Sequence, residues 1–174
     1  MIFLSGIHGV GKTFFCNLVK EELGIKSYSA SQLIIEKRNK EFATDKFVSD
    51  IDDNQLLLIE AINELRQNEE EFILDGHFCL LNTCGEVTRI PYNTFELLKP
   101  DTIILLTEKP DIIAERRFQR DGIIQDICEI RKFQEAEKQY AQEVSQNFRV
   151  PLQISNGAYD LRHIVDFIKT VGGV

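Results

Sequence analysis

The sequence predicts a single α/β domain with a parallel sheet flanked by helices. Three observations support this prediction. Short apolar runs alternate with longer helical patterns, a glycine-rich motif joins the first apolar run to the first helix, and 174 residues supply one core of ordinary size. The apolar fraction of 43% beside 28% charged residues is typical of a globular protein and excludes disordered and collagen-like chains.

Each predicted element is defined by the spacing of its apolar residues. Five runs are predicted as strands, at residues 1–5, 25–29, 72–75, 102–106 and 151–155. Six helices are predicted at residues 12–23, 31–40, 52–67, 111–120, 125–148 and 159–171. The fifth helix carries apolar residues three, four or seven positions apart, which form one face: Ile127, Ile130, Phe133, Tyr140, Val144 and Phe148. Residues 42–51 and 79–92 fit neither pattern, and long excursions of this kind typically shape a binding cleft.

Charge and cysteine content narrow the function classes. Twenty basic and 28 acidic side chains give a net charge of −8, which disfavours nucleic-acid partners and anionic membrane surfaces. No apolar run approaches the roughly 20 residues of a membrane helix, and the first residues lack the basic region of a secretory signal. Four cysteines at scattered positions form no metal-ligand pattern and are predicted to be reduced thiols: Cys16, Cys79, Cys84 and Cys128. We therefore expect a cytoplasmic protein that does not bind membranes.

The motif GIHGVGKT at residues 6–13 matches the phosphate-binding pattern G-x-x-x-x-G-K-[ST] between a strand and a helix. Gly6, Gly9 and Gly11 permit backbone N–H groups to converge on phosphate oxygens, and the start of the helix adds its positive dipole end. Lys12 is expected to reach the β- and γ-phosphates of ATP, and Thr13 to offer its hydroxyl to Mg²⁺. The alternative is a glycine turn with an exposed lysine.

The predicted nucleotide-binding set also includes the other residues of the loop and the first helical turn, His8, Val10 and Phe14. His8 invites a catalytic role. A side chain at its position more often packs against the loop or faces solvent, so we leave His8 out of the catalytic set.

A second signal is FILDGHF, where an apolar run ends at Asp75. Ligands of parallel sheets bind beyond the carboxyl ends of the strands, and Mg²⁺ uses few protein carboxylates. Asp75 is therefore predicted as the metal-side acid, with capping of the next turn as the alternative. His77 either faces the acceptor or is satisfied by backbone.

The segment ERRFQRD at residues 115–121 supplies guanidinium groups. Arg116 and Arg120 are four residues apart and share a helix face, whereas Arg116 and Arg117 are not expected to point the same way. Guanidinium groups clamp phosphate oxygens and stabilise the charge of a transferring phosphoryl group. Lys12, Arg116 and Arg120 are therefore predicted as catalytic, and a solvated charged face is the alternative for the arginines.

Together these segments resemble the P-loop nucleoside-monophosphate kinases, most closely the archaeal-type adenylate kinases. The resemblance covers nearly the whole chain in order: GIHGVGKT, YSASQLI, ILDGHF, LLKPDTIILLTEKPDIIAERR, the RD pair, QEAEKQYA and PLQISN. It implies the P-loop NTPase fold with a five-stranded parallel sheet in the order 2-3-1-4-5, in a single domain spanning residues 1–174. It also implies an acceptor-binding region at about residues 29–70, and a lid at about residues 116–131 that carries Arg116, Arg117 and Arg120, with Arg117 as a further nucleotide-binding residue. Asn156 would lie near the adenine.

The chain departs from the family pattern on the acceptor side. The aspartate that usually follows the second strand is absent from residues 29–32. Bacterial adenylate kinases continue the third strand into DGFPR, whose arginine grips the acceptor phosphate, whereas here Gly76 is followed by His77, Phe78 and Cys79. Arg38 and Arg89 are the remaining candidates for that contact.

The sequence thus predicts an ATP- and Mg²⁺-dependent phosphotransferase. Its acceptor would be a nucleotide, a nucleoside or another small molecule, a nucleoside monophosphate being one candidate. The alternative is a P-loop ATPase that acts as a nucleotide-dependent switch. The oligomeric state stays open.

Overall fold

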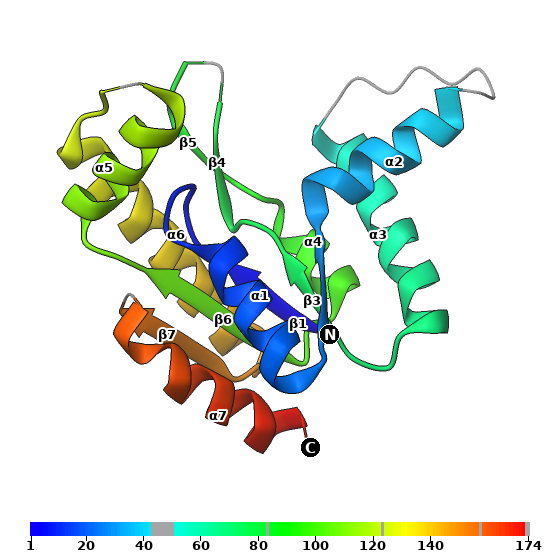
Figure 1. The fold of residues 1–174 in the computed structure, drawn as a ribbon. Helices are drawn as coiled ribbons and strands as arrows, with labels where there is room; N and C mark the ends of the chain where they lie inside the picture. The colour runs from blue at the N-terminus through cyan, green and yellow to red at the C-terminus, as the bar shows by residue number, and fades with distance from the viewer. Residues whose placement is uncertain (43–50, 83, 123, 157, 173–174) are drawn as a thin grey trace.

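A five-stranded parallel sheet forms the centre of the computed structural model, which describes residues 1–42, 51–82, 84–122, 124–156 and 158–172 (Figure 1). Its strands are β1 (Ile2–Ser5), β2 (Lys26–Ser29), β3 (Phe72–Asp75), β6 (Thr102–Thr107) and β7 (Leu152–Asn156). They lie in the order β2-β3-β1-β6-β7, and every neighbouring pair is parallel. The predicted order 2-3-1-4-5 is confirmed, because a separate two-stranded hairpin takes the numbers 4 and 5.

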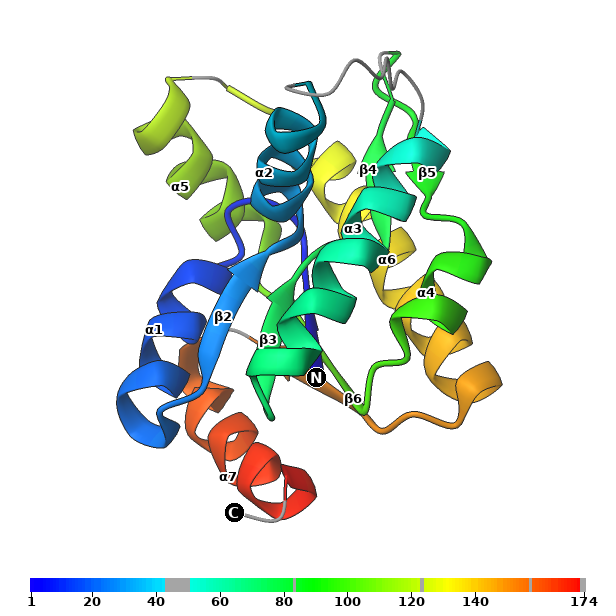
Figure 2. The same cartoon turned by 90° about the vertical axis from the view of Figure 1, so that its right-hand side faces the viewer.

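Seven α-helices are described, and six of them are the predicted ones, with ends that differ by at most two residues. They are α1 (Lys12–Leu23), α2 (Ala30–Phe42), α3 (Ile51–Asn68), α4 (Tyr92–Leu98), α5 (Pro110–Asp121), α6 (Ile127–Phe148) and α7 (Leu161–Gly172), the last preceded by a 3₁₀ turn at Ala158–Asp160. Figures 1 and 2 show α1 and α7 on one face of the sheet and α4 and α6 on the other. The pair α2 and α3 lies at the β2 edge and extends beyond the carboxyl ends of the strands.

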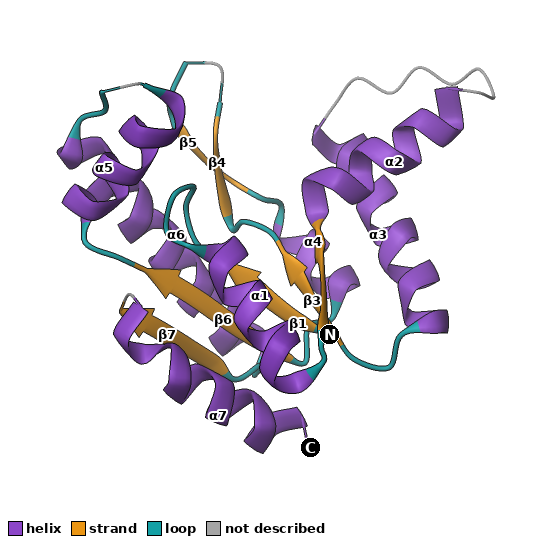
Figure 3. Cartoon of the chain, viewed as in Figure 1, coloured by secondary structure: helices purple, strands orange, loops and turns teal. Residues whose placement is uncertain are grey.

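Residues 79–92, which fitted neither pattern in the sequence, contain a hairpin of β4 (Cys79–Leu81) and β5 (Val87–Arg89) followed by α4 (Figure 3). Three-residue strands are too short to show an alternating pattern. Contacts with the rest of the chain fix this segment, since the Ile90 amide donates to the Phe78 carbonyl and the Tyr140 hydroxyl donates to the Ile90 carbonyl. The other excursion, residues 42–51, lies mostly outside the described residues.

The core is densest around the central strands. Every residue of β1 and β6 is buried, as expected for strands covered by helices on both faces, whereas the edge strands β2 and β7 are partly exposed. An aromatic cluster ties the turn after β3 to the sheet: the Phe78 ring lies 5.0 Å from that of Phe3 and 4.8 Å from that of Phe95. The carboxyl ends of β1 and β3 are therefore held in fixed positions.

Two further observations concern the broad class of the protein. Among the described residues, no helix combines the length and apolar character needed to cross a membrane. The four cysteines carry free thiols, with Cys16 and Cys79 buried and Cys84 and Cys128 exposed.

Candidate functional site

The loop between β1 and α1 has a backbone that only glycine accommodates. Gly6 has a φ of +143°, and a Cβ there would lie 2.6 Å from the Leu106 carbonyl oxygen. Gly9 has a φ of +85°, with the Arg117 Cγ 3.1 Å from the place of its missing Cβ. Gly11 caps α1 with no side-chain hydrogen bond, so the first amides of the helix stay available for a ligand. The loop backbone therefore has the shape that an anion-binding cradle requires.

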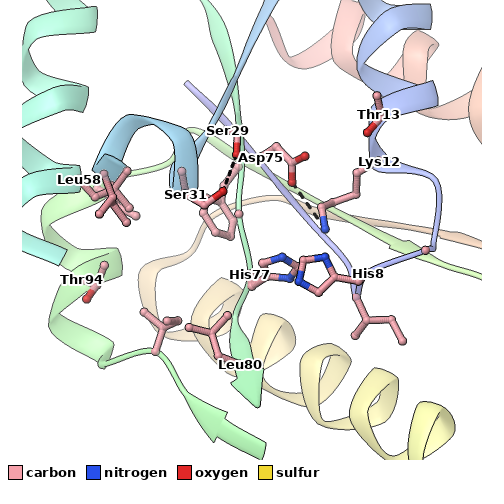
Figure 4. Close-up of a pocket in the computed structure, with 18 of the residues that line it drawn as sticks. His8, Lys12, Thr13, Ser29, Ser31, Leu58, Asp75, His77, Leu80 and Thr94 are labelled. Atoms are coloured by element: carbon pink, nitrogen blue, oxygen red, sulfur yellow. Dashed lines mark hydrogen bonds and ion pairs between the residues drawn. The ribbon is translucent and has the colours of Figure 1, made fainter. Parts of the chain in front are cut away.

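Lys12 folds back over this cradle instead of extending into solvent. Only 8% of Lys12 is exposed, its Nζ donates to the Gly6 carbonyl at 2.5 Å, and it lies 3.6 Å from an oxygen of Asp75 (Figure 4). Burial lowers the pKa of Lys12, and the neighbouring Asp75 and Glu137 carboxylates counteract that shift. The alternative of a glycine turn with an exposed lysine is wrong.

Asp75 ends β3 directly beside β1, where Leu4 is its register partner. Its side chain is 23% exposed, and burial raises its pKa against the opposing effect of Lys12. Among the described residues, no backbone amide donates to its carboxylate, so the structure gives the turn-capping alternative no support. The carboxylate faces the cradle.

Two arginines of α5 contact the loop directly. Arg116 donates to the carbonyls of Gly9 at 3.3 Å and Val10 at 3.1 Å, and pairs with Glu108 at 3.2 Å. Arg117 donates to the His8 carbonyl at 2.7 Å.

The position of Arg117 corrects the prediction that Arg116 and Arg117 do not point the same way, because both contact the loop. Arg117 is only 7% exposed and donates to Gln125 at 2.5 Å, and its Nη2 is buried without a hydrogen-bond partner. Successive helix residues are about 100° apart, so both Arg116 and Arg117 can flank one contact surface. Arg120, by contrast, is exposed and pairs with its neighbour Asp121 through two contacts of 2.6 and 2.7 Å.

Two cavities meet at the loop. The first has a volume of about 450 Å³ and is bounded on its loop side by His8, Gly9, Gly11, Lys12, Thr13, Asp75, His77, Arg116 and Arg120. The second, of about 430 Å³, is lined by Val10, Gly11, Thr13, Phe14, Leu106, Thr107, Arg116, Ser155 and Leu161. Gly11, Thr13 and Arg116 border both, so a ligand can extend from one cavity across the loop into the other.

The far wall of the first cavity comes from four separate segments. Ser29, Ala30, Ser31 and Ile34 lie around the start of α2, Gln55 and Leu58 on α3, Leu80 and Ile90 on the hairpin, and Thr94, Phe95 and Leu98 on α4. The predicted acceptor region, residues 29–70, therefore contributes to this wall. The hairpin segment lines it too, as expected of a cleft-shaping excursion.

Asn156 lies at the carboxyl end of β7, next to the second cavity. Its side-chain oxygen accepts from the Thr107 hydroxyl at 3.2 Å, and its backbone N–H donates to the Asp160 carboxylate at 2.9 Å. Phe14, 63% exposed, lines the same cavity from α1.

Two histidines face each other at the loop side of the first cavity, and Figure 4 shows their rings adjacent. The His8 and His77 ring centroids are 4.6 Å apart. Burial, aided by the charge of Lys12, lowers the pKa of His77 to about 2, and burial also lowers that of His8. A backbone hydrogen bond with Gly6 opposes the shift of His77. His77 thus both faces the cavity and contacts backbone, which were the two readings of its sequence position.

A buried carboxylate that the sequence analysis missed joins the two halves of the site. Glu137 of α6 is fully buried and accepts from the Ser5 hydroxyl, the Phe78 amide at 2.9 Å and the Cys79 amide at 2.6 Å. Burial raises its pKa. The sequence did contain a signal for its burial, because position 137 lies between Phe133 and Tyr140 on the apolar face of α6.

The two arginines suggested for gripping an acceptor phosphate lie elsewhere. Arg89 pairs with Glu143 at 2.6 and 2.9 Å and stacks over the Tyr140 ring at 4.6 Å. Arg38 donates to Asn54. Neither arginine lines either cavity.

Comparison with known sequences identifies relatives over most of the chain. Residues 5–145 match a family model described as AAA domain. The chain is 30% identical over 122 residues to the "Putative adenylate kinase" of Methanocaldococcus jannaschii and 27% identical over 149 residues to an adenylate kinase of Pyrobaculum aerophilum. These matches cover 68% and 80% of this chain, but 58% and 76% of the two relatives.

Solved structures of small-molecule kinases share the fold. A gluconokinase from Sinorhizobium meliloti 1021 superposes with a TM-score of 0.56 at 17% identity, covering 98% of this chain and 89% of that one. A shikimate kinase from Bacteroides thetaiotaomicron gives a TM-score of 0.54 at 16% identity, covering 99% and 98%. At these identities the likeness concerns the fold alone.

Proposed function

Because this chain belongs to the AAA domain family and has the fold of the P-loop kinases, we propose that it transfers the γ-phosphate of ATP to a small-molecule acceptor. The observation that carries the proposal is the position of Lys12. It lies over a backbone anion cradle, and that cradle lies between two cavities of similar size. Phosphoryl transfer needs this arrangement of a donor and an acceptor on either side of the moving group.

The second cavity suits the donor nucleoside. Val10, Phe14 and Leu161 offer apolar contacts to a base, and Thr107 and Ser155 lie at the ends of adjacent strands. Asn156, beside Thr107, is proposed to lie near the adenine. The triphosphate would then cross the loop at Gly6, Gly9 and Gly11.

The residues around Lys12 fit a hydrated Mg²⁺. Thr13 is exposed at the junction of the two cavities, and the Asp75 carboxylate has Lys12 as its cationic neighbour with room on its cavity side. One hydroxyl and one carboxylate suit a cation that keeps several waters. When bound, Mg²⁺ would neutralise charge on the phosphate oxygens.

The cationic side chains are proposed to have different roles in binding and transfer. Lys12 and Arg116 meet the donor phosphates, and Arg120, exposed at the rim of the first cavity, reaches the phosphoryl group during transfer. Arg117 positions the loop through the His8 carbonyl. Catalysis then consists of positioning and charge stabilisation, which phosphoryl transfer chiefly requires. We keep the prediction that the protein acts in the cytoplasm.

The alternative function is an ATPase that switches conformation and passes no phosphoryl group to a metabolite. The first cavity favours the kinase. It extends from the loop past Asp75 to α3 and α4, a volume of about 450 Å³ within the range of small-molecule sites. A nucleotide switch has no need of a second cavity next to the γ-phosphate.

A transfer screen tests the proposal. The protein is incubated with ATP and Mg²⁺ and with panels of nucleosides, nucleoside monophosphates and small metabolites, and the acceptor is followed by mass spectrometry. We expect a gain of one phosphoryl group on an acceptor, lost in Lys12→Ala. ATP binding and slow hydrolysis with no acceptor modified in any panel would favour the switch.

A further inference from the structure

The first cavity has an uneven distribution of charge. Its cationic residues, Lys12, Arg116 and Arg120, all lie on the loop side. The far wall, among the described residues, consists of apolar side chains and four neutral polar ones: Ser29, Ser31, Gln55 and Thr94. No described residue of that wall carries a charge.

The three cations on the loop side already have partners. Lys12 contacts the Gly6 carbonyl and Asp75, Arg116 contacts two loop carbonyls and Glu108, and Arg120 is paired with Asp121 through two hydrogen bonds. The donor triphosphate would recruit Lys12 and Arg116. Among the described lining residues, only Arg120 then remains for an acceptor phosphate with up to two further negative charges. Asp121 partly balances its charge, and the same guanidinium is proposed to act on the moving phosphoryl group.

Arg38 and Arg89, the candidates for neutralising such a phosphate, have their partners outside the cavity. Arg89 is held by Glu143 and Tyr140, and Arg38 by Asn54. Removing an anion from water without a paired cation costs several kcal/mol, while a hydroxyl needs only one hydrogen-bond partner. The same reasoning disfavours acceptors that carry a carboxylate.

The far wall also limits the shape of the acceptor. Phe95 and Leu98 are each 1% exposed at the cavity floor, and Leu58, Ile34 and Ile90 extend the apolar surface. A polyhydroxylated sugar would find too few polar partners there. The Gln55 amide both donates and accepts hydrogen bonds, and Thr94 adds a hydroxyl, a combination that suits the edge of a planar heterocycle.

We infer that the acceptor is an uncharged nucleoside, phosphorylated on a hydroxyl, and not a nucleoside monophosphate. The inference rests on the proposed kinase function. The base packs against the apolar side chains of α3 and α4 in the far wall, and the sugar hydroxyl points toward Asp75 and the loop. A bond forms between the hydroxyl oxygen and the γ-phosphorus, the bond from that phosphorus to the β,γ-bridging oxygen breaks, ADP leaves with the electron pair, and the hydroxyl proton is released to water.

The test compares each nucleoside with its own 5′-monophosphate. Adenosine, guanosine, cytidine, uridine and thymidine, their monophosphates, shikimate and gluconate are assayed with ATP and Mg²⁺, and kcat/KM is measured for every compound. We expect at least one nucleoside to exceed its monophosphate by 100-fold or more. A monophosphate, shikimate or gluconate used as well as or better than every nucleoside would overturn the inference and leave the kinase proposal intact. If no compound is phosphorylated, both fall.

A matched pair of variants tests the charge argument. Ser31 lines the cavity at the start of α2, whereas its exposed neighbour Gln32 does not. Ser31→Arg places a guanidinium beside the transfer point and should lower the nucleoside-to-monophosphate ratio of kcat/KM at least tenfold, while Gln32→Arg should leave the ratio unchanged. Equal ratios in the two folded variants, checked by thermal melting, would contradict the inference.

Discussion

The loop side and the far wall of the first cavity are built in different ways. The loop side is built around the consecutive residues 6–13, whose backbone is proposed to bind phosphate, and three glycines with positive φ hold that backbone in shape. The far wall consists of side chains from α2, α3, the β4–β5 hairpin and α4, which packing brings together. A contiguous backbone site recognises a common group such as phosphate. A wall of dispersed side chains determines which acceptor is held, and it can differ between proteins with the same loop.

The largest effect should follow removal of the charge on the loop side. Lys12→Ala removes the ammonium group over the cradle, and we expect turnover to fall about 1,000-fold, or about 4 kcal/mol, with the fold retained. ATP affinity from calorimetry and transfer rates check this. Lys20→Ala, on the exposed side of the same helix, is the control. Undiminished turnover and affinity in Lys12→Ala would remove the phosphate-loop assignment.

Glu137 links the loop side of the cavity to the segment that leads into the far wall, because it accepts hydrogen bonds from Ser5 before the loop and from the turn after β3. Removing its carboxylate tests whether this link stabilises the fold. Glu137→Ala leaves two amides buried without partners, at about 1–3 kcal/mol each, so we expect a loss of about 3 kcal/mol in unfolding free energy. Urea unfolding measures it, with exposed Glu135→Ala as the control. A loss below about 1 kcal/mol would mean that the two sides are held together by other contacts.

Substitutions of the α5 arginines should distinguish a role in phosphoryl transfer from a role in holding the loop in place. Arg120→Ala removes an exposed guanidinium proposed to act on the moving phosphoryl group, so we expect turnover to fall about 30-fold, or about 2 kcal/mol, with ATP affinity little changed. Arg117→Ala removes the buried contact to the His8 carbonyl, so ATP affinity and stability should both fall. Steady-state transfer and calorimetry without acceptor distinguish these patterns. Equal, small effects in both variants and in Arg116→Ala would exclude this helix face from phosphoryl transfer.

Asp75 tests the metal assignment at the boundary between the two sides. Asp75→Asn keeps the size of the side chain but loses its charge, so the Mg²⁺ concentration needed for half-maximal transfer should rise about tenfold with little change in melting temperature. A large loss of stability with unchanged Mg²⁺ dependence would restore the turn-capping interpretation. The measurement is a Mg²⁺ titration of the transfer rate.

The smallest predicted effect concerns His77, which faces Lys12, His8 and Glu137. Its pKa is lowered to about 2 in the folded protein, so below pH 6.5 the unfolded chain binds a proton that the folded one does not. Stability is therefore lost as pH falls, and one such group contributes about 0.8 kcal/mol between pH 7.5 and pH 6. The free energy of unfolding is measured with urea in EDTA at both pH values. We expect His77→Gln to lose about 0.8 kcal/mol less than the unmutated protein as pH falls, and the exposed control His163→Gln to lose as much as the unmutated protein. Identical pH dependence in both variants would contradict the burial of a neutral imidazole.

Several features were predictable because they depend on neighbours in the sequence. The five core strands, six helices, the phosphate loop and the position of Asp75 followed from local spacing, and the order of the strands followed from the resemblance to the nucleoside-monophosphate kinases. The β4–β5 hairpin and α4 were not predicted, since three-residue strands carry no periodic signal and gain their stability from packing on α6. The joint contact of Arg116 and Arg117 with the loop was not predicted, because helix geometry alone does not say how wide an arc of a helix its neighbour covers.

The sequence by itself determined the chemistry of the loop. A run of eight residues, GIHGVGKT, contains the glycines, the lysine and the threonine in covalent register, and its backbone conformation depends mainly on those residues. Only the tertiary structure decided what lies opposite. Glu137, Thr94 and Leu58 are far apart in the chain and become parts of one site through burial, which also leaves Arg38 and Arg89 outside it. Burial depends on the packing of the whole domain, and no local spacing encodes it.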